Sequence, residues 1–177
     1  MHIWKHFCTI TKHRWLVRRY CFKVGLYWQG LIHDLSKYSP TEFWSGARYW
    51  QGNRSPNNAE REAKGISMAW LHHKGRNKHH FEYWIDYYPG EKRILGGMPM
   101  PKKYIAEMIM DRISACRIYM GSSYTEQAPY NYYLRGTDKF WFIHKNTAAD
   151  LEMLLKMTAE KGEKETLSYI KNIYLKS

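Results

Sequence analysis

The spacing of apolar residues in this chain is helical over most of its length, and this pattern constrains the fold more than any other feature. Within residues 3–23, for example, Ile10, Val17 and Tyr20 fall on one helical face. Valine, which strands favour, occurs only at positions 17 and 24. A hydrophobic content of 44% over 177 residues also argues against a disordered basic tail. We therefore expect an all-α fold.

Capping and helix-breaking residues predict where these helices begin and end. The run Ser39-Pro40-Thr41-Glu42 has an N-cap, a proline at the first helical position and a capping-box glutamate. Three glycines and three prolines predict an irregular loop over residues 87–101, and Gly162 is expected to break a helix. The predicted helices are 3–23, 26–37, 40–50, 57–73, 101–121, 146–161 and a last one from Gly162 to Leu175.

No repeat or linker divides the chain, so we expect residues 1–177 to form one domain, with 121–177 as a C-terminal helical extension. No run of 18 apolar residues is present, and residues 1–6 lack the apolar core of a signal peptide. The three cysteines have neither the pairing of a disulfide framework nor the spacing of a zinc site. These features predict a reduced, cytoplasmic protein with no membrane partner.

The charge balance favours phosphate-bearing partners. The chain has 28 Lys and Arg against 16 Asp and Glu, a net charge of +12. Such an excess attracts nucleotides and nucleic acids alike. Charge alone does not choose between these partners, although the scatter of the basic residues, rather than one long run, argues against a protein that only binds nucleic acid.

Ligand-type side chains gather in two short motifs, HDLSK at 33–37 and HHKGRNKHH at 72–80. Lys37 lies four residues after His33 and three after Asp34, so all three can address one pocket. In the second motif, His72 pairs with His79, or His73 with His80, at a spacing of seven residues.

Two further polar residues, His13 and Asp111, lie on apolar faces of predicted helices. A buried carboxylate needs a partner, and an ordinary core contact would account for either residue alone. Together with the two motifs, however, they form a set of imidazoles and carboxylates that suits Fe, Mn, Co, Ni or Zn better than Mg or Ca. The set is too large for one tetrahedral zinc, and a two-metal centre bridged by Asp34 uses it most naturally.

The ordered set His13, His33-Asp34 and Asp111 resembles the H…HD…D signature of the HD-domain superfamily of metal-dependent phosphohydrolases. HDLSK is similar to the HD-x-x-K form of the GYP-type branch, and this resemblance implies that His73, His79 and His80 complete a multinuclear site. The pattern HDLSK…EF…HHxxxNxHH is also similar to a small family of bacterial and phage proteins of unknown function assigned to the same superfamily. The resemblance covers about residues 10–120 and implies an HD-like helical bundle.

The resemblance implies a metal-dependent phosphohydrolase that acts on a nucleotide or another small phosphate ester. A metal-activated hydroxide would attack phosphorus, with Asp34 bridging one or two ions and Lys37 stabilising the phosphoryl charge. Residues 81–84 replace the G-Y-P tripeptide, so a cyclic-dinucleotide substrate is not expected. Two alternatives stay open: an HD-type di-iron oxygenase, whose ligand set is similar, and a basic helical protein that binds nucleic acid without catalysis.

Overall fold

A computed structural model describes residues 1–89, 94–136 and 142–177 of the chain. The fold is mainly helical, as predicted, with one two-stranded antiparallel sheet in the described part. None of the described helices is both long and apolar enough to cross a membrane. The main helices and the strands are α1 (Ile3–Lys23), α2 (Tyr27–Ile32), α3 (Pro40–Tyr49), α4 (Pro56–Lys64), α5 (Met68–Lys74), β1 (Ile85–Tyr87), β2 (Leu95–Gly97), α6 (Lys102–Met120), α7 (Ala128–Leu134) and α8 (Lys145–Tyr169).

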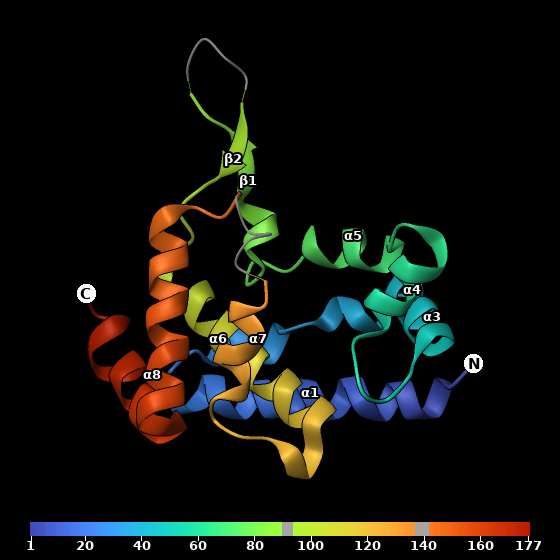
Figure 1. Ribbon diagram of the computed structural model, residues 1–177, viewed down its shortest axis with the longest axis horizontal. Helices are drawn as coiled ribbons and strands as arrows, with labels where there is room; N and C mark the ends of the chain where they lie inside the picture. Colours follow the sequence, from blue (N-terminus) through green and yellow to red (C-terminus); the bar gives the residue numbers. More distant parts are fainter. Residues whose placement is uncertain (90–93, 137–141) are drawn as a thin grey trace.

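The helices surround a core to which both halves of the chain contribute. In Figure 1, α1 runs along the base of the molecule. Helices α3 to α5 lie on the side of the N-terminal end of α1, and α8 lies on the opposite side of the molecule. The β1–β2 hairpin stands away from the helices. Apolar side chains of α1, α6 and α8 meet in one buried cluster, which includes Val17, Cys21, Ile105, Ile109, Ile113, Leu151, Leu154 and Leu155.

The C-terminal extension bends at Gly162, as predicted. Gly162 has a φ of 85° and a ψ of 165°, and its positive φ is readily adopted only by glycine. The next residue, Glu163, accepts hydrogen bonds from Tyr20 of α1 (2.7 Å), Arg117 of α6 (2.8 Å) and Tyr124 (2.5 Å). This buried carboxylate therefore ties the extension to the core helices.

Three predicted boundaries are wrong. The helix expected over 26–37 ends at Ile32 and is followed by a short 3₁₀ helix, Leu35–Tyr38. The helix expected over 57–73 is two helices, because Gly65 takes a left-handed φ of 75° and Ser67 caps a new helix. The loop expected over 87–101 includes part of a hairpin in which Ile85 pairs with Gly97 and Tyr87 with Leu95. Residues 90–93 of that loop lie outside the described residues.

Candidate metal centre

The HD pair lies in a turn between two helices. His33 has non-helical angles (φ −46°, ψ 125°), and Asp34 is left-handed (φ 53°, ψ 27°). A non-glycine residue at positive φ is strained, and such residues concentrate at functional sites. Arg14 of α1 holds the turn, because its guanidinium donates to the carbonyl oxygens of His33 (2.7 Å) and Leu31 (3.2 Å). The break in the helix brings two adjacent side chains to one point, whereas adjacent residues of a continuous helix diverge.

Side chains from α1, the turn and α6 form a first candidate metal position. One ligand atom from each of His13, His33, Asp34 and Asp111 lies within 4.8 Å of the others. His13 Nε2 lies 2.9 Å from Asp111 Oδ1 and 3.6 Å from Asp34 Oδ2. His33 Nε2 lies 3.4 Å from Asp34 Oδ2 and 3.6 Å from Asp111 Oδ1.

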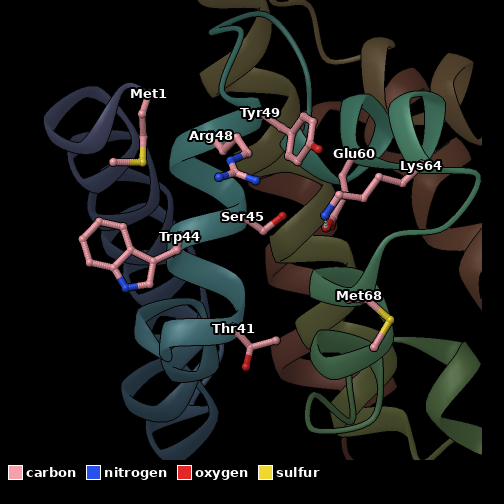
Figure 2. A pocket seen from close by; sticks show the side chains of 9 residues that line it. All are labelled: Met1, Thr41, Trp44, Ser45, Arg48, Tyr49, Glu60, Lys64 and Met68. Carbon is pink, nitrogen blue, oxygen red and sulfur yellow. Dashed lines mark hydrogen bonds and ion pairs between the residues drawn. The ribbon is translucent and has the colours of Figure 1, made fainter.

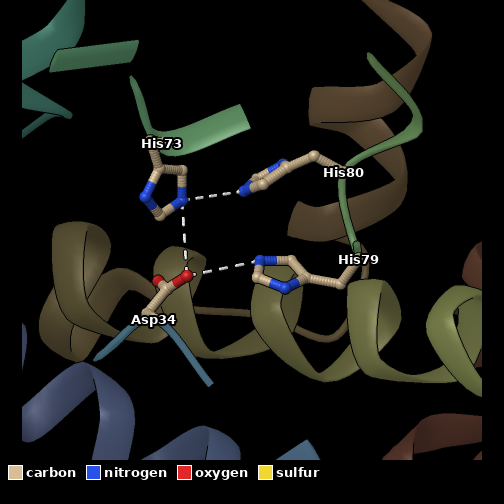
Figure 3. Close-up of side chains that lie close together, drawn as sticks. All are labelled: Asp34, His73, His79 and His80. Atoms are coloured by element: carbon tan, nitrogen blue, oxygen red, sulfur yellow. Dashed lines mark hydrogen bonds and ion pairs between the residues drawn. The ribbon is translucent and has the colours of Figure 1, made fainter. Parts of the chain in front are cut away.

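The other oxygen of Asp34 faces a second candidate position, shown in Figure 3. His73 Nε2 and His79 Nε2 lie 3.3 Å and 3.4 Å from Asp34 Oδ1. His80 Nε2 lies 3.0 Å from His73 Nε2, so two imidazoles contact this oxygen and the third joins the group through His73. Asp34 therefore belongs to both groups and contributes a different oxygen to each.

These distances are those expected between two ligands of one metal ion. Ligand atoms bound about 2.1 Å from an ion lie about 3.0 Å apart at a right angle and about 3.4 Å apart at a tetrahedral angle. Five atoms of the centre are also buried with no hydrogen-bond partner in the described part of the chain: His13 Nε2, His33 Nε2, His79 Nε2 and both Asp34 carboxylate oxygens. A buried polar atom without any partner costs about 1–3 kcal/mol, and coordination of a cation would remove that cost. Ion pairs with Asp111 and Lys37 already offset it for His13 Nε2 and Asp34 Oδ2.

Two buried glutamates orient the imidazoles from outside the centre. Glu107 Oε1, on α6, lies 2.8 Å from His33 Nδ1 and 3.2 Å from His79 Nδ1. Glu42 Oε2, on α3, lies 2.7 Å from His73 Nδ1. Because an ionised carboxylate only accepts hydrogen bonds, each Nδ1 is assigned the proton. In the metal-bound form the ring is neutral, and its Nε2 lone pair faces the centre. Without a metal, burial lowers the pKa of His33, but Asp34, Asp111 and Glu107 outweigh burial and raise that pKa well above its usual value, so a bound ion would displace the Nε2 proton of this ring.

The charges of the centre support one another despite their burial. Burial opposes ionisation of Asp34, but His33, Lys37 and His73 outweigh it and hold the Asp34 pKa well below its usual value. Burial likewise opposes ionisation of Asp111, and contacts with His13 and His33 again lower the pKa. Both carboxylates are therefore ionised at neutral pH and available as ligands.

Lys37 lies at the edge of this centre. Its Nζ forms an ion pair with Asp34 Oδ2 at 2.6 Å. Burial lowers the pKa of Lys37, but the Asp34 charge outweighs burial and raises that pKa, so the ammonium stays protonated. The Lys37 side chain is 27% exposed while that of Asp34 is fully buried. Lys37 is thus a cation that a solute could reach next to the ligand cluster.

The structure brings together every residue predicted as a metal ligand, namely His13, His33, Asp34, His73, His79, His80 and Asp111. His72, left open by spacing alone, lies outside both groups, and its Nδ1 contacts Glu42 Oε1 at 2.6 Å. Metal binding itself stays a prediction.

Sequence reasoning missed one further residue of the centre and favoured the wrong role for another. Glu107 was not identified, although a second carboxylate one turn before Asp111 on an apolar helix is a usable signal. Glu42 was expected to close a capping box, with a role as a metal ligand or behind the ligands as the weaker alternative. Ser39 does cap α3, but its own backbone N–H donates to Ser36, and the Glu42 carboxylate contacts His72 and His73 instead.

A pocket of about 460 Å³ lies apart from the centre, among α3, α4 and α5 (Figure 2). Its buried carboxylate, Glu60, accepts hydrogen bonds from Ser67 Oγ (2.7 Å) and the Ala69 backbone N–H (3.3 Å), and Lys64 lies 3.4 Å away. These contacts satisfy Glu60 and join α4 to α5. No metal-ligand group of the described residues includes it.

Residues 2–157 match a family of unknown function, DUF5662. The chain belongs to this family. The DUF5662 match includes both candidate metal positions and ends within α8. Neither the curated proteins nor the solved structures provide a match to the chain.

Proposed function

We propose that this chain is an HD-type metal-dependent phosphohydrolase acting on a nucleotide or another small phosphate ester. The observation that carries the proposal is the placement of Asp34, a fully buried carboxylate with one oxygen directed at each of two ligand groups. A carboxylate shared by two adjacent ions is typical of hydrolytic two-metal sites. The chain order His13, His33-Asp34 and Asp111 supports an HD-type assignment.

The donor atoms fit one or two divalent transition-metal ions. His13, His33 and Asp111 would hold one ion, the imidazoles of His73, His79 and His80 the other, and Asp34 both. Five imidazoles and two carboxylates suit Fe, Mn, Co, Ni or Zn. Bound ions of this kind lower the pKa of a coordinated water towards neutrality and polarise a phosphoryl oxygen.

The residues of the chain have separate tasks in this reaction. Asp34 would serve both positions, because one of its two oxygens faces each ligand group. Lys37 contacts the phosphoryl oxygens and stabilises the negative charge that grows on them in the transition state. The net charge of +12 favours the approach of an anionic substrate.

Elemental analysis combined with an activity panel tests the proposal. The purified protein is expected to contain a transition metal and to release phosphate from nucleotides or p-nitrophenyl phosphate in a metal-dependent way. Tightly bound iron with oxygen consumption and no phosphate release would replace hydrolysis by an HD-type oxygenase reaction. Nucleic-acid binding that survives alanine at both His33 and Asp34, with no metal in the wild type, would favour a binding protein.

A further inference from the structure

Glu107 contacts one predicted ligand of each metal position. We infer that Glu107 is a positioning residue that couples the two positions, so that its loss weakens ion binding at both. This inference rests on the metal centre of the proposed function and concerns a residue that coordinates neither ion.

The coupling follows from the geometry of a single carboxylate oxygen. Glu107 Oε1 lies 2.8 Å from His33 Nδ1 and 3.2 Å from His79 Nδ1. His33 belongs to the first position and His79 to the second. Glu107 is 4% exposed, and burial leaves its carboxylate little room to turn. Displacement of this oxygen therefore disturbs the orientation of both rings at once.

Glu107 also connects the His33 and His79 rings to α6, the helix that carries the predicted ligand Asp111. Asp111 follows Glu107 by four residues on α6, so the two side chains lie on the same face, one turn apart. α6 therefore places one carboxylate in the first position and another behind both positions.

His33, His79 and Glu107 also lie close enough together to suggest a third ion. Such an ion would bind His33 and His79 at Nδ1 while their Nε2 atoms face the other positions. Each ring would then have to lose both of its N–H protons. The 2.8 Å separation of His33 Nδ1 and Glu107 Oε1 is instead typical of a hydrogen bond. We therefore assign Glu107 to orientation rather than to coordination.

Glu42 provides a contrast within the same centre. Its Oε2 contacts His73 Nδ1 at 2.7 Å, and its Oε1 contacts His72 Nδ1 at 2.6 Å. His72 belongs to neither group, so Glu42 supports the second position only. Loss of Glu42 is expected to weaken one ion, whereas loss of Glu107 is expected to weaken two.

The test measures Co²⁺ binding to the full chain by competition with a chromophoric chelator, together with the visible spectrum of bound Co²⁺. Two background variants isolate the two metal positions. Asp111→Asn removes a ligand of the first position and leaves the second intact, whereas His80→Ala removes a ligand of the second and leaves the first intact. Glu107→Ala should weaken Co²⁺ binding about 10- to 100-fold in each background, a loss typical of outer-shell carboxylates. Glu42→Ala should do so only in the Asp111→Asn background.

Glu163→Ala is the matched control, because Glu163 is also a buried carboxylate with several hydrogen-bond donors but lies outside both groups. It should lower the melting temperature and leave Co²⁺ affinity and the spectrum unchanged. Glu107→Gln retains an acceptor oxygen and should lose less affinity than Glu107→Ala. If Glu107→Ala does not fold, Glu107→Gln must weaken both positions for the inference to stand.

An effect of Glu107→Ala in only one background, or in neither, would overturn the coupling while leaving the metal centre in place. A wild-type chain that binds no Co²⁺ and contains no metal would overturn the proposed function, and the coupling with it. If Glu107→Ala lowers the melting temperature but leaves Co²⁺ affinity and the Co²⁺ spectrum unchanged, as expected for Glu163→Ala, then Glu107 contributes to stability alone and the inference is overturned.

Discussion

Replacement of Asp34 by asparagine should remove both metal ions with little change in side-chain shape. Both Asp34 oxygens face imidazole nitrogens at 3.3–3.6 Å, one oxygen for each position. An amide retains one weaker ligand oxygen, and its NH₂ group, which lacks a lone pair, must face the other position. We expect a metal content of two ions in the wild type, none in Asp34→Asn, and one in Asp111→Asn.

The size of the effect on thermal stability follows from linkage. An ion present at 1,000 times its dissociation constant stabilises the folded state by about 4 kcal/mol. For 177 residues the entropy of unfolding is about 0.37 kcal/mol/K, because each residue contributes about 2.1 cal/mol/K. Each filled position should therefore raise the melting temperature by about 11 °C.

Differential scanning fluorimetry with metal and with a chelator measures this increment in each variant. The difference between the two conditions cancels any effect of Asp34→Asn on the metal-free protein. Asp86→Asn, the same change at an exposed residue of β1, is the control and should behave as the wild type does. An increment in Asp34→Asn as large as that of the wild type, with unchanged metal content, would refute a shared carboxylate.

Lys37→Ala should retain both ions and lower kcat about 10²- to 10³-fold, because it removes a group that stabilises phosphoryl charge; unchanged turnover on any hydrolysed phosphate ester would rule out this role. Burial, aided by the Lys37 charge, lowers the pKa of His6 to about 4, so between pH 6.5 and 4 the unfolded state binds more protons. Lowering the pH from 7.5 to 5 should therefore reduce the free energy of unfolding by about 2 kcal/mol through His6. Urea unfolding at the two pH values measures this loss, and the His6→Gln variant should not show it. Gly46→Ala should destabilise the fold by about 1–3 kcal/mol, since a Cβ there would clash with the His6 ring. The His6→Ala background should relieve this penalty, and full additivity in the double variant would contradict the predicted clash.

Local patterns were sufficient for the long helices. Ser39 and Pro40 begin α3, Pro101 precedes α6, and Gly162 bends α8, each as capping and helix-breaking chemistry predicts. The short helices were harder to predict. The pattern over 57–73 continues through Gly65, and a single glycine inside a helical pattern does not by itself show that the helix ends there.

The ligand types and their order are visible in the sequence, because two short motifs gather imidazoles and a carboxylate, and His13 and Asp111 on apolar helix faces would be costly to bury without a partner. The hydrogen bonds behind them are not visible. Glu42 has the position of a capping residue, and Glu107 is separated from His33 by 74 residues. The sequence can mark Glu107 as a carboxylate on the face of Asp111, but it does not show which imidazoles either carboxylate contacts, since those contacts depend on how the helices pack.

By itself, the sequence determined that this chain is helical, where its long helices begin and end, and which side chains are candidates for metal coordination. These properties depend on residues close together in the chain. Only the tertiary structure decided that the helix breaks at Asp34, that the two oxygens of this residue face different groups, and that Glu107 contacts both. Arg14 of α1 holds that break, and Glu107 of α6 contacts His33 across 74 residues of sequence, so both features depend on contacts between different helices and not on the local pattern.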